Sequence, residues 1–190
     1  MQQTKDERLD AALLKVMGDG GPLNHDRVAE EAGVSRRTVY RRFVDQEALR
    51  ARIWTLLTPE GAMPDDLDAL LGHGLRDKFR AFDERAVAMT MAMSSVEGRA
   101  MRNERKAERV AAYSEMFSDA VEGLNAEDAR QAIAAMQLLC SGFAWREMRD
   151  QWDLDADGIA RASVWAIRAL LDDLKSRDGR SLDAPLPAPR

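Results

Sequence analysis

The segment AGVSRRTVYRRF, residues 32–43, combines a glycine, a serine and four arginines that fall within seven residues. Ser35 is a good N-cap for a helix that runs to about Phe43, and Gly33 supplies a tight turn just before it. A short helical pattern precedes the glycine. The segment therefore predicts two short helices joined by a turn, which is the layout of a helix-turn-helix.

The helix predicted after Ser35 has two chemically different sides. On a wheel with about 100° per residue, one arc carries Arg36, Arg37, Tyr40 and Arg41. The opposite arc carries the apolar residues Val39 and Phe43, and Thr38 and Arg42 fall between the two arcs. In a helix-turn-helix the second helix lies in the major groove of DNA. Arginine can bond guanine with two hydrogen bonds, and threonine and tyrosine hydroxyls commonly bond phosphates.

Charge alone leaves two interpretations of this helix open. The chain has a formal net charge of -5, yet residues 35–52 hold six arginines against two acidic residues. A solvated basic helix face would explain the arginines without any ligand. DNA binding also needs positive charge only where phosphates lie. The turn, the cap and the two-sided wheel together favour DNA binding.

Composition restricts the class of protein. Hydrophobic residues make up 45% and charged residues 32% of the 190 residues, which suits a globular helical chain. The N-terminus shows no signal peptide, and no apolar run approaches the ~20 residues of a membrane span. We therefore expect a cytoplasmic, all-α protein. The single cysteine, Cys140, excludes an intramolecular disulfide and a multi-cysteine metal site.

Helical spacing of apolar residues continues along nearly the whole chain. We predict a helix over residues 4–18 with a capping box of Thr4 and Glu7. A short helix is predicted from Asn24 or Asp26 to about Ala32, and a fourth helix from Asp45 through Thr58. The stretch from Thr58 to Pro64 indicates a junction. The predicted organisation is a three-helix helix-turn-helix domain over 1–58, a larger helical domain over 59–176 and a disordered, proline-rich tail over 177–190.

Three patterns stand out in the larger domain. The segment AVAMTMAMSSV, residues 86–96, is apolar on nearly all sides, which predicts a buried helix. A single helix is predicted over about 126–150, with Asn125 as its cap. A last helix is predicted to begin at Asp155 or Asp157.

The run VAEEAGVSRRTVYRRFVDQEALRARI, residues 28–53, resembles the DNA-binding domain of the tetracycline-repressor (TetR) family of bacterial transcription regulators. The matching elements are Ala29, Ala32, Gly33, Val34, Ser35, Thr38, Tyr40, Phe43, Glu47, Ala48 and Leu49. The resemblance covers roughly residues 4–58. It implies a homodimer whose two recognition helices enter successive major grooves of a double-stranded DNA operator. It also implies phosphate contacts by Thr38 and Tyr40, and base or backbone contacts by Arg36, Arg37 and Arg41.

Three positions depart from the family pattern. Position 37 is commonly a small residue and position 42 often a histidine, but both are arginine here. Position 46, usually a phosphate-contacting lysine, is Gln46, which can donate a hydrogen bond but supplies no charge. Arg37 and Arg42 either specify a DNA sequence or replace the charge missing at Gln46. We therefore include Arg42 and Gln46 among the candidate DNA contacts.

The resemblance further implies a ligand-binding body that shifts the spacing of the two DNA-binding domains. Methionine-rich walls adapt to varied ligands, although such a run is also typical of ordinary core. The candidate ligand is a small apolar or amphipathic molecule. The candidate walls of the ligand pocket are Met89, Met93, Tyr113, Met116, Phe117, Phe143, Trp145 and Met148.

The last two predicted helices resemble the dimerisation helices of the family. Their apolar stripes need a second partner besides the chain's own core, and a four-helix interface between two chains would supply it. The candidate interface residues are Ile133, Met136, Cys140, Val164, Ile167 and Leu171. Cys140 is predicted to be a buried small hydrophobe. His25 is predicted to have a role at the start of its helix, with a phosphate contact as the alternative.

Three functions compete. The first is a ligand-responsive repressor, and the second is a ligand-independent dimeric regulator whose body only dimerises or binds a partner protein. The third, an enzyme, lacks a metal-ligand spacing, a phosphate-binding loop and a nucleophile with a base partner. We expect no catalytic residue, no metal and no cofactor.

Overall fold

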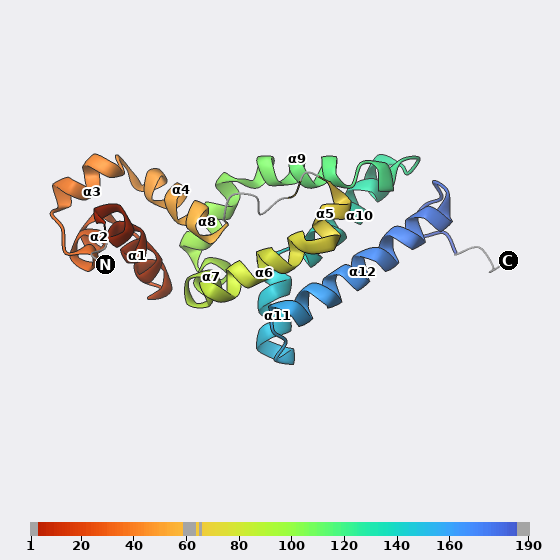
Figure 1. Cartoon of the computed structure of the whole chain (residues 1–190). Coiled ribbons are helices and arrows are strands. Elements are labelled where there is room, and N and C mark those ends of the chain that lie inside the picture. The colour runs from red at the N-terminus through yellow and green to blue at the C-terminus, as the bar shows by residue number, and fades with distance from the viewer. Residues whose placement is uncertain (1–3, 59–63, 65, 186–190) are drawn as a thin grey trace. The chain divides into compact units, whose positions relative to one another are not determined.

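The structure, a computed structural model, describes residues 4–58, 64 and 66–185 (Figure 1). All regular elements in these ranges are helical, which confirms the predicted all-α class. Of the junction predicted from Thr58 to Pro64, residues 59–63 lie outside the described residues. Among the described residues, every helix is too short or too polar to span a lipid bilayer.

By internal contacts the chain divides into two compact units. The first unit takes in Met1–Ala62 and Ala81–Arg105, and the second takes in Met63–Arg80 and Lys106–Arg190. The sequence-based boundary at residue 58 is therefore not where the contacts separate. The extent of the functional DNA-binding domain stays a prediction.

The first unit begins with four helices close to the predicted positions. They are α1 (Lys5–Gly18), α2 (His25–Ala32), α3 (Arg36–Arg42) and α4 (Gln46–Leu57) (Figure 1). A side-chain oxygen accepts a backbone N–H at the start of each helix; the capping residues are Thr4, Asn24, Ser35 and Asp45. Thr4 and Glu7 form the predicted capping box. Between α2 and α3, Gly33 has φ 62°, a left-handed conformation that glycine adopts most easily.

An apolar core holds these four helices together. On α3, Val39 is fully buried and Phe43 just after it is 4% exposed, so the predicted apolar arc packs inward. Burying a side chain of this kind contributes about 1.5–3 kcal/mol. The other buried apolar side chains of these four helices include Leu9, Leu13, Val16, Val28, Leu49 and Ile53. The packing fixes one side of α3 and leaves its polar side exposed.

Two more helices belong to the first unit, α7 (Ala86–Ser94) and α8 (Val96–Glu104). Helix α7 contacts α1, and α8 contacts α4. Met89 and Met93 are buried as predicted, but Val87 is 70% exposed and Val96 is 88% exposed. The prediction of burial on nearly all sides of 86–96 is therefore wrong on one side.

The second unit contains most of the longer helices. It starts with α5 (Leu67–Ala69) and the π-helical turn η1 (Leu70–Gly74), which lead into α6 (Leu75–Glu84); the boundary between the units falls inside α6. The remaining elements are α9 (Lys106–Met116), the 3-10 turn η2 (Asp119–Val121), α10 (Ala126–Leu139), α11 (Gly142–Trp152) and α12 (Ala156–Arg177). Helix α12 contacts both α10 and α11.

The prediction of a single helix over about 126–150 is wrong, because the helix is interrupted between α10 and α11. The hydroxyl of Ser141 accepts the backbone N–H groups of Phe143 at 3.2 Å and Ala144 at 3.3 Å, and so caps α11. Apolar residues on both sides of the break continue the helical pattern. A serine side chain can accept backbone N–H groups and so start a new helix. The spacing of apolar residues does not reveal such an interruption.

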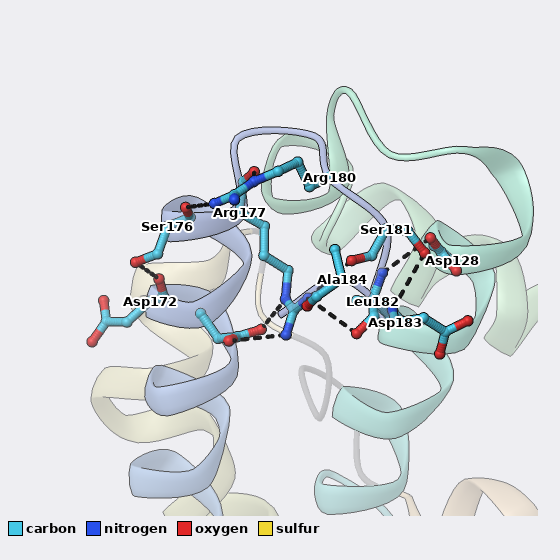
Figure 2. Close-up of polar contacts among 10 residues, drawn as sticks. Asp128, Asp172, Ser176, Arg177, Arg180, Ser181, Leu182, Asp183 and Ala184 are labelled. Carbon is cyan, nitrogen blue, oxygen red and sulfur yellow. Dashed lines mark hydrogen bonds and ion pairs between the residues drawn. The ribbon is translucent and has the colours of Figure 1, made fainter. Parts of the chain in front are cut away.

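The tail was predicted to be disordered over 177–190, but the structure describes it up to residue 185. The guanidinium of Arg177 donates to the carbonyl oxygens of Ser181 at 2.9 Å, Leu182 at 3.0 Å and Ala184 at 2.9 Å (Figure 2). The backbone N–H of Leu182 donates to the buried carboxylate of Asp128 at 3.1 Å. These bonds hold the segment against α10 and α12, so the prediction is wrong for 177–185. Residues 186–190 lie outside the described part.

Candidate DNA-binding surface

The polar side of α3 is open to solvent. Arg36, Arg37, Tyr40, Arg41 and Arg42 are all exposed, and Tyr40 retains 40% of its surface. Thr38 is half-buried and its hydroxyl lies 3.0 Å from that of Ser35. The helix therefore presents the polar arc that its sequence predicts, anchored by the buried Val39.

Most arginines of the basic stretch are neutralised inside the first unit. Arg50 of α4 lies 3.1 Å from Glu97 and 2.6 Å from Glu104, both on α8. Arg52 of α4 makes a two-bond ion pair with Asp10 of α1. These pairs fasten α4 to two neighbouring helices, which accounts for two of the six arginines.

Two arginines of α3 also have acidic neighbours. The guanidinium of Arg36 lies 3.0 Å from Asp26, and that of Arg42 lies 3.8 Å from Asp6. The hydrogen bond with Tyr40 and the charge of Asp26 raise the pKa of Arg36. Both ion pairs are exposed to solvent, so each contributes little to stability.

Arg37 and Arg41 remain. Within the described ranges neither side chain has an ion-pair or hydrogen-bond partner. They are one helical turn apart and therefore neighbours on the helix surface. An unpaired guanidinium carries its full positive charge and five donors to whatever approaches it. The polar side of α3 therefore carries two positive charges that no described acidic side chain offsets.

Gln46 is committed to contacts within the protein. Its side-chain nitrogen donates to the carbonyl oxygen of Leu23 at 3.1 Å and lies 3.5 Å from a carboxylate oxygen of Glu97. The predicted side-chain contact to phosphate would require these bonds to break. These contacts tie the start of α4 to Leu23 and Glu97.

His25 makes contacts with α3 and its C-terminal end that the sequence analysis did not predict. The ring is 7% exposed and stacks on Tyr40, with ring centroids 3.9 Å apart and 3° between the planes. Its Nε2 donates to the carbonyl oxygen of Phe43 at 2.8 Å. The two partners lie 15 and 18 residues further along the chain, so no local pattern could reveal them. The predicted role at the start of α2 is compatible with this position.

Residues 9–53 match the family model of bacterial regulatory proteins of the tetR family. The matched range contains the whole helix-turn-helix described above. Residues 9–53 are therefore a TetR-family DNA-binding domain. The chain that carries this domain is a DNA-binding transcriptional regulator. No curated protein and no solved structure matches the chain.

The rest of the chain, residues 54–190, lies outside the matched range. Of the eight residues predicted to line a ligand pocket, Met89 and Met93 belong to the first unit and the other six to the second. Phe117 and Trp145 have no solvent-accessible surface, so they line no water-sized cavity in this conformation. Phe143 is 45% exposed and faces solvent. Tyr113 is buried, and Met148 is half-buried.

Met116 is the predicted pocket residue that borders a described cavity. This cavity, of about 580 Å³, lies beside α5, α9 and η2. Its wall includes four carboxylates, those of Asp66, Asp68, Glu115 and Asp119. We call it the acidic cavity.

A second groove has the opposite charge. It has a volume of about 410 Å³ and lies between η1, α6 and α12. Its wall includes the side chains of Arg76, Arg161 and Arg168, together with Trp165. We call it the arginine groove.

The predicted dimer residues divide into two groups. Met136, Cys140 and Ile167 are fully buried within the single chain, so they cannot contact a second chain while the core stays closed. These three side chains lie on the sides of their helices that face the chain's own core. Ile133, Val164 and Leu171 are half-buried and stay candidates.

The same helices also carry exposed apolar side chains that are not among the predicted interface residues. Leu138 is 56% exposed, Trp152 73% and Trp165 74%. The described residues contain no group of three or more histidine, cysteine or acidic side chains that could hold a metal ion.

Proposed function

We propose that this protein is a transcriptional repressor that binds operator DNA as a homodimer and is released from it by a small molecule. The observation that carries the DNA-binding mode is the exposed pair Arg37 and Arg41. Both guanidinium groups stand on the polar side of α3, and neither is neutralised within the described part of the first unit.

In this proposal α3 enters the major groove. Arg37 and Arg41 reach base edges or the adjacent phosphates, and Thr38 and Tyr40 bond phosphates. Arg42 is close to Asp6 and serves as a secondary backbone contact. Phosphate contacts supply salt-dependent affinity, whereas base contacts supply specificity.

The DNA-binding proposal is tested by selecting bound sequences from a random double-stranded library and measuring affinity for the selected site. We expect a palindromic sequence with two half-sites about one helical turn apart. Arg37→Ala and Arg41→Ala should weaken binding, whereas Arg130→Ala, which removes an exposed arginine of α10, should not. Equal loss in all three variants would point to nonspecific charge attraction.

The homodimer is supported by the apolar surface of the last three helices. Leu138, Phe143, Trp152 and Trp165 would each keep between 45% and 74% of their surface in water in a monomer. Large exposed apolar patches commonly mark protein interfaces. A two-fold pairing that involves α10, α11 and α12 would cover them.

The ligand response is supported by the acidic cavity. Its volume of about 580 Å³ lies within the range of ligand pockets, roughly 300–1,000 Å³. Met116 provides an adaptable apolar wall, and the carboxylates would orient a cationic group. The proposed ligand is therefore a small amphipathic cation.

The acidic cavity and the arginine groove allow this ligand class to be tested by comparing a cationic dye with an anionic dye. The cationic dye acridine orange and the anionic dye 8-anilinonaphthalene-1-sulfonate would be titrated into protein without DNA. Glu115→Gln combined with Asp119→Asn should weaken binding of the cation by about tenfold and leave the anion unchanged. Arg161→Gln in the arginine groove is the matched control, with no effect on the cation.

A ligand-independent regulator is the alternative, favoured by the filled core around Phe117 and Trp145. In that case neither dye would bind at the acidic cavity with an affinity that depends on Glu115 and Asp119. Operator affinity would also be unchanged by every small molecule in a release screen.

A further inference from the structure

The tyrosine at position 40 is held from several directions. Its ring stacks on His25 with 3.9 Å between centroids, in nearly parallel planes. The guanidinium of Arg36 lies 5.3 Å from the same ring centroid and donates to the tyrosine hydroxyl at 3.3 Å. An exposed tyrosine normally samples several rotamers, so these contacts restrict it.

Each holding group is itself anchored. Because a carbonyl oxygen only accepts hydrogen bonds, Nε2 of His25 carries a hydrogen and donates it to Phe43 at the end of α3. His25 is almost fully buried, so its ring cannot swing away without opening the packing between α2 and α3. Arg36 is fixed at its other side by Asp26, 3.0 Å away.

The direction of the hydrogen bonds leaves one donor unused. The Tyr40 oxygen accepts from Arg36, which has no acceptor atoms of its own. The hydroxyl hydrogen of Tyr40 is therefore available to a further acceptor. Hydrogen bonds in a chain polarise one another, and a cation behind a hydroxyl makes it a better donor. A phosphate oxygen is the acceptor of matching charge.

We infer that His25, Asp26 and Arg36 are positioning residues that orient the Tyr40 hydroxyl as a donor to one DNA phosphate. This inference rests on the proposed DNA-binding mode. It assigns Arg36 to Tyr40 rather than to a base, and leaves base contacts to Arg37 and Arg41. The fixed tyrosine then sets the register of α3 along the DNA backbone.

A double-mutant cycle on the full-length protein tests the inference. Tyr40→Phe should weaken binding to the selected operator by about tenfold, because it removes one hydrogen bond to a charged group. Arg36→Gln and His25→Ala should each weaken binding about threefold to tenfold in the wild-type background. In the Tyr40→Phe background neither should have a further effect, because both act through the hydroxyl.

Two further variants separate positioning from folding. His25→Phe keeps an aromatic ring for Tyr40 to stack on but cannot donate to Phe43, so it should lower the melting temperature and retain most of the operator affinity. Arg36→Gln changes an exposed side chain and should leave the melting temperature unchanged. A sequence selection with Arg36→Gln should return the wild-type operator.

Three results would overturn the inference. One is additive loss of affinity in the two backgrounds, which is expected if His25 only stabilises the fold. Another is relaxed preference at one base pair with Arg36→Gln, which would make Arg36 a base reader. The third is failure of the wild-type protein to select any DNA sequence, which would remove the proposed binding mode together with the inference.

Discussion

Six arginines between Arg36 and Arg52 give the sequence its basic character, but the side chains have different tasks. Arg50 and Arg52 tie α4 to acidic residues of α8 and α1. Arg36 is shared between Asp26 and Tyr40. Counting charges along the sequence therefore overstates the positive surface. Phosphates are attracted by the charge that remains after pairing with acidic side chains of the protein. We therefore expect Arg37 and Arg41 to contribute most to DNA binding.

Arg37→Ala and Arg41→Ala are each expected to weaken operator binding and to reduce its salt dependence. Removing one arginine that bonds a phosphate should lower the slope of log affinity against log salt by about one. If Arg37 reads a base instead, the slope should stay constant and one operator position should lose its preference, with a cost of about 1–3 kcal/mol. Fluorescence anisotropy at several salt concentrations distinguishes these outcomes. An unchanged affinity and footprint across operator variants would show that Arg37 does not touch the DNA.

Cys140 illustrates how burial changes a single group. Burial raises the pKa of its thiol from 9.0 to about 11. Below pH 9 the thiol is protonated in both folded and unfolded protein, so it adds no pH dependence. Between pH 9 and about 11 only the unfolded protein loses the proton, and folding becomes less favourable as pH rises.

The expected result is a steeper fall in the free energy of unfolding for wild type than for Cys140→Ala. The extra slope should approach about 1.4 kcal/mol per pH unit in this window. Urea unfolding between pH 8 and 10.5 measures the difference, and the comparison removes contributions from other groups. Parallel curves for the two proteins would mean that the thiol ionises equally well when folded.

At the scale of helices and turns, two glycines offer a matched comparison. Gly33 and Gly72 both have open space where a Cβ would be placed, but only Gly33 has a positive φ. Gly33→Ala should therefore destabilise the protein by about 1–2 kcal/mol through backbone strain alone. Gly72→Ala should stabilise it by about 0.5–1 kcal/mol, because alanine favours a helical conformation. Thermal unfolding of the two variants should shift in opposite directions, and a shared direction would contradict the turn conformation.

The accuracy of sequence-based prediction also differs between elements. Local rules predicted α1 to α4 well, since capping residues and a glycine turn act within a few residues. They failed at Ser141, where apolar residues on both sides concealed a helix start. They also failed after Arg177. That side chain bonds backbone carbonyl groups of residues 181–184, and these bonds form only once the chain has folded back beyond the end of α12. Periodicity identifies an apolar stripe without telling which partner covers it.

At the scale of the whole molecule, a second chain can bind only to apolar side chains that the chain's own core leaves exposed. Residues 59–190 hold 24 acidic against 18 basic residues, a net charge of -6, and would be repelled by phosphates, which leaves DNA contact to the first helices. In the proposed homodimer, the two helix-turn-helix domains would be joined by helices that lie far from them in the sequence. The exposed apolar side chains of α10, α11 and α12 are the available material.

Trp165→Glu combined with Phe143→Glu is expected to convert the dimer into a monomer, because it places charges in an apolar interface. Sedimentation velocity should show the mass fall to that of one 21.2 kDa chain. Operator affinity should drop by at least about 100-fold, since the second half-site would no longer bind as part of the same molecule. Affinity for an isolated half-site should be unchanged.

Val87→Glu removes an equally exposed apolar side chain from α7 and should leave the dimer intact. If the double variant stays dimeric, the interface lies elsewhere, and Ile133, Val164 and Leu171 become the next positions to substitute.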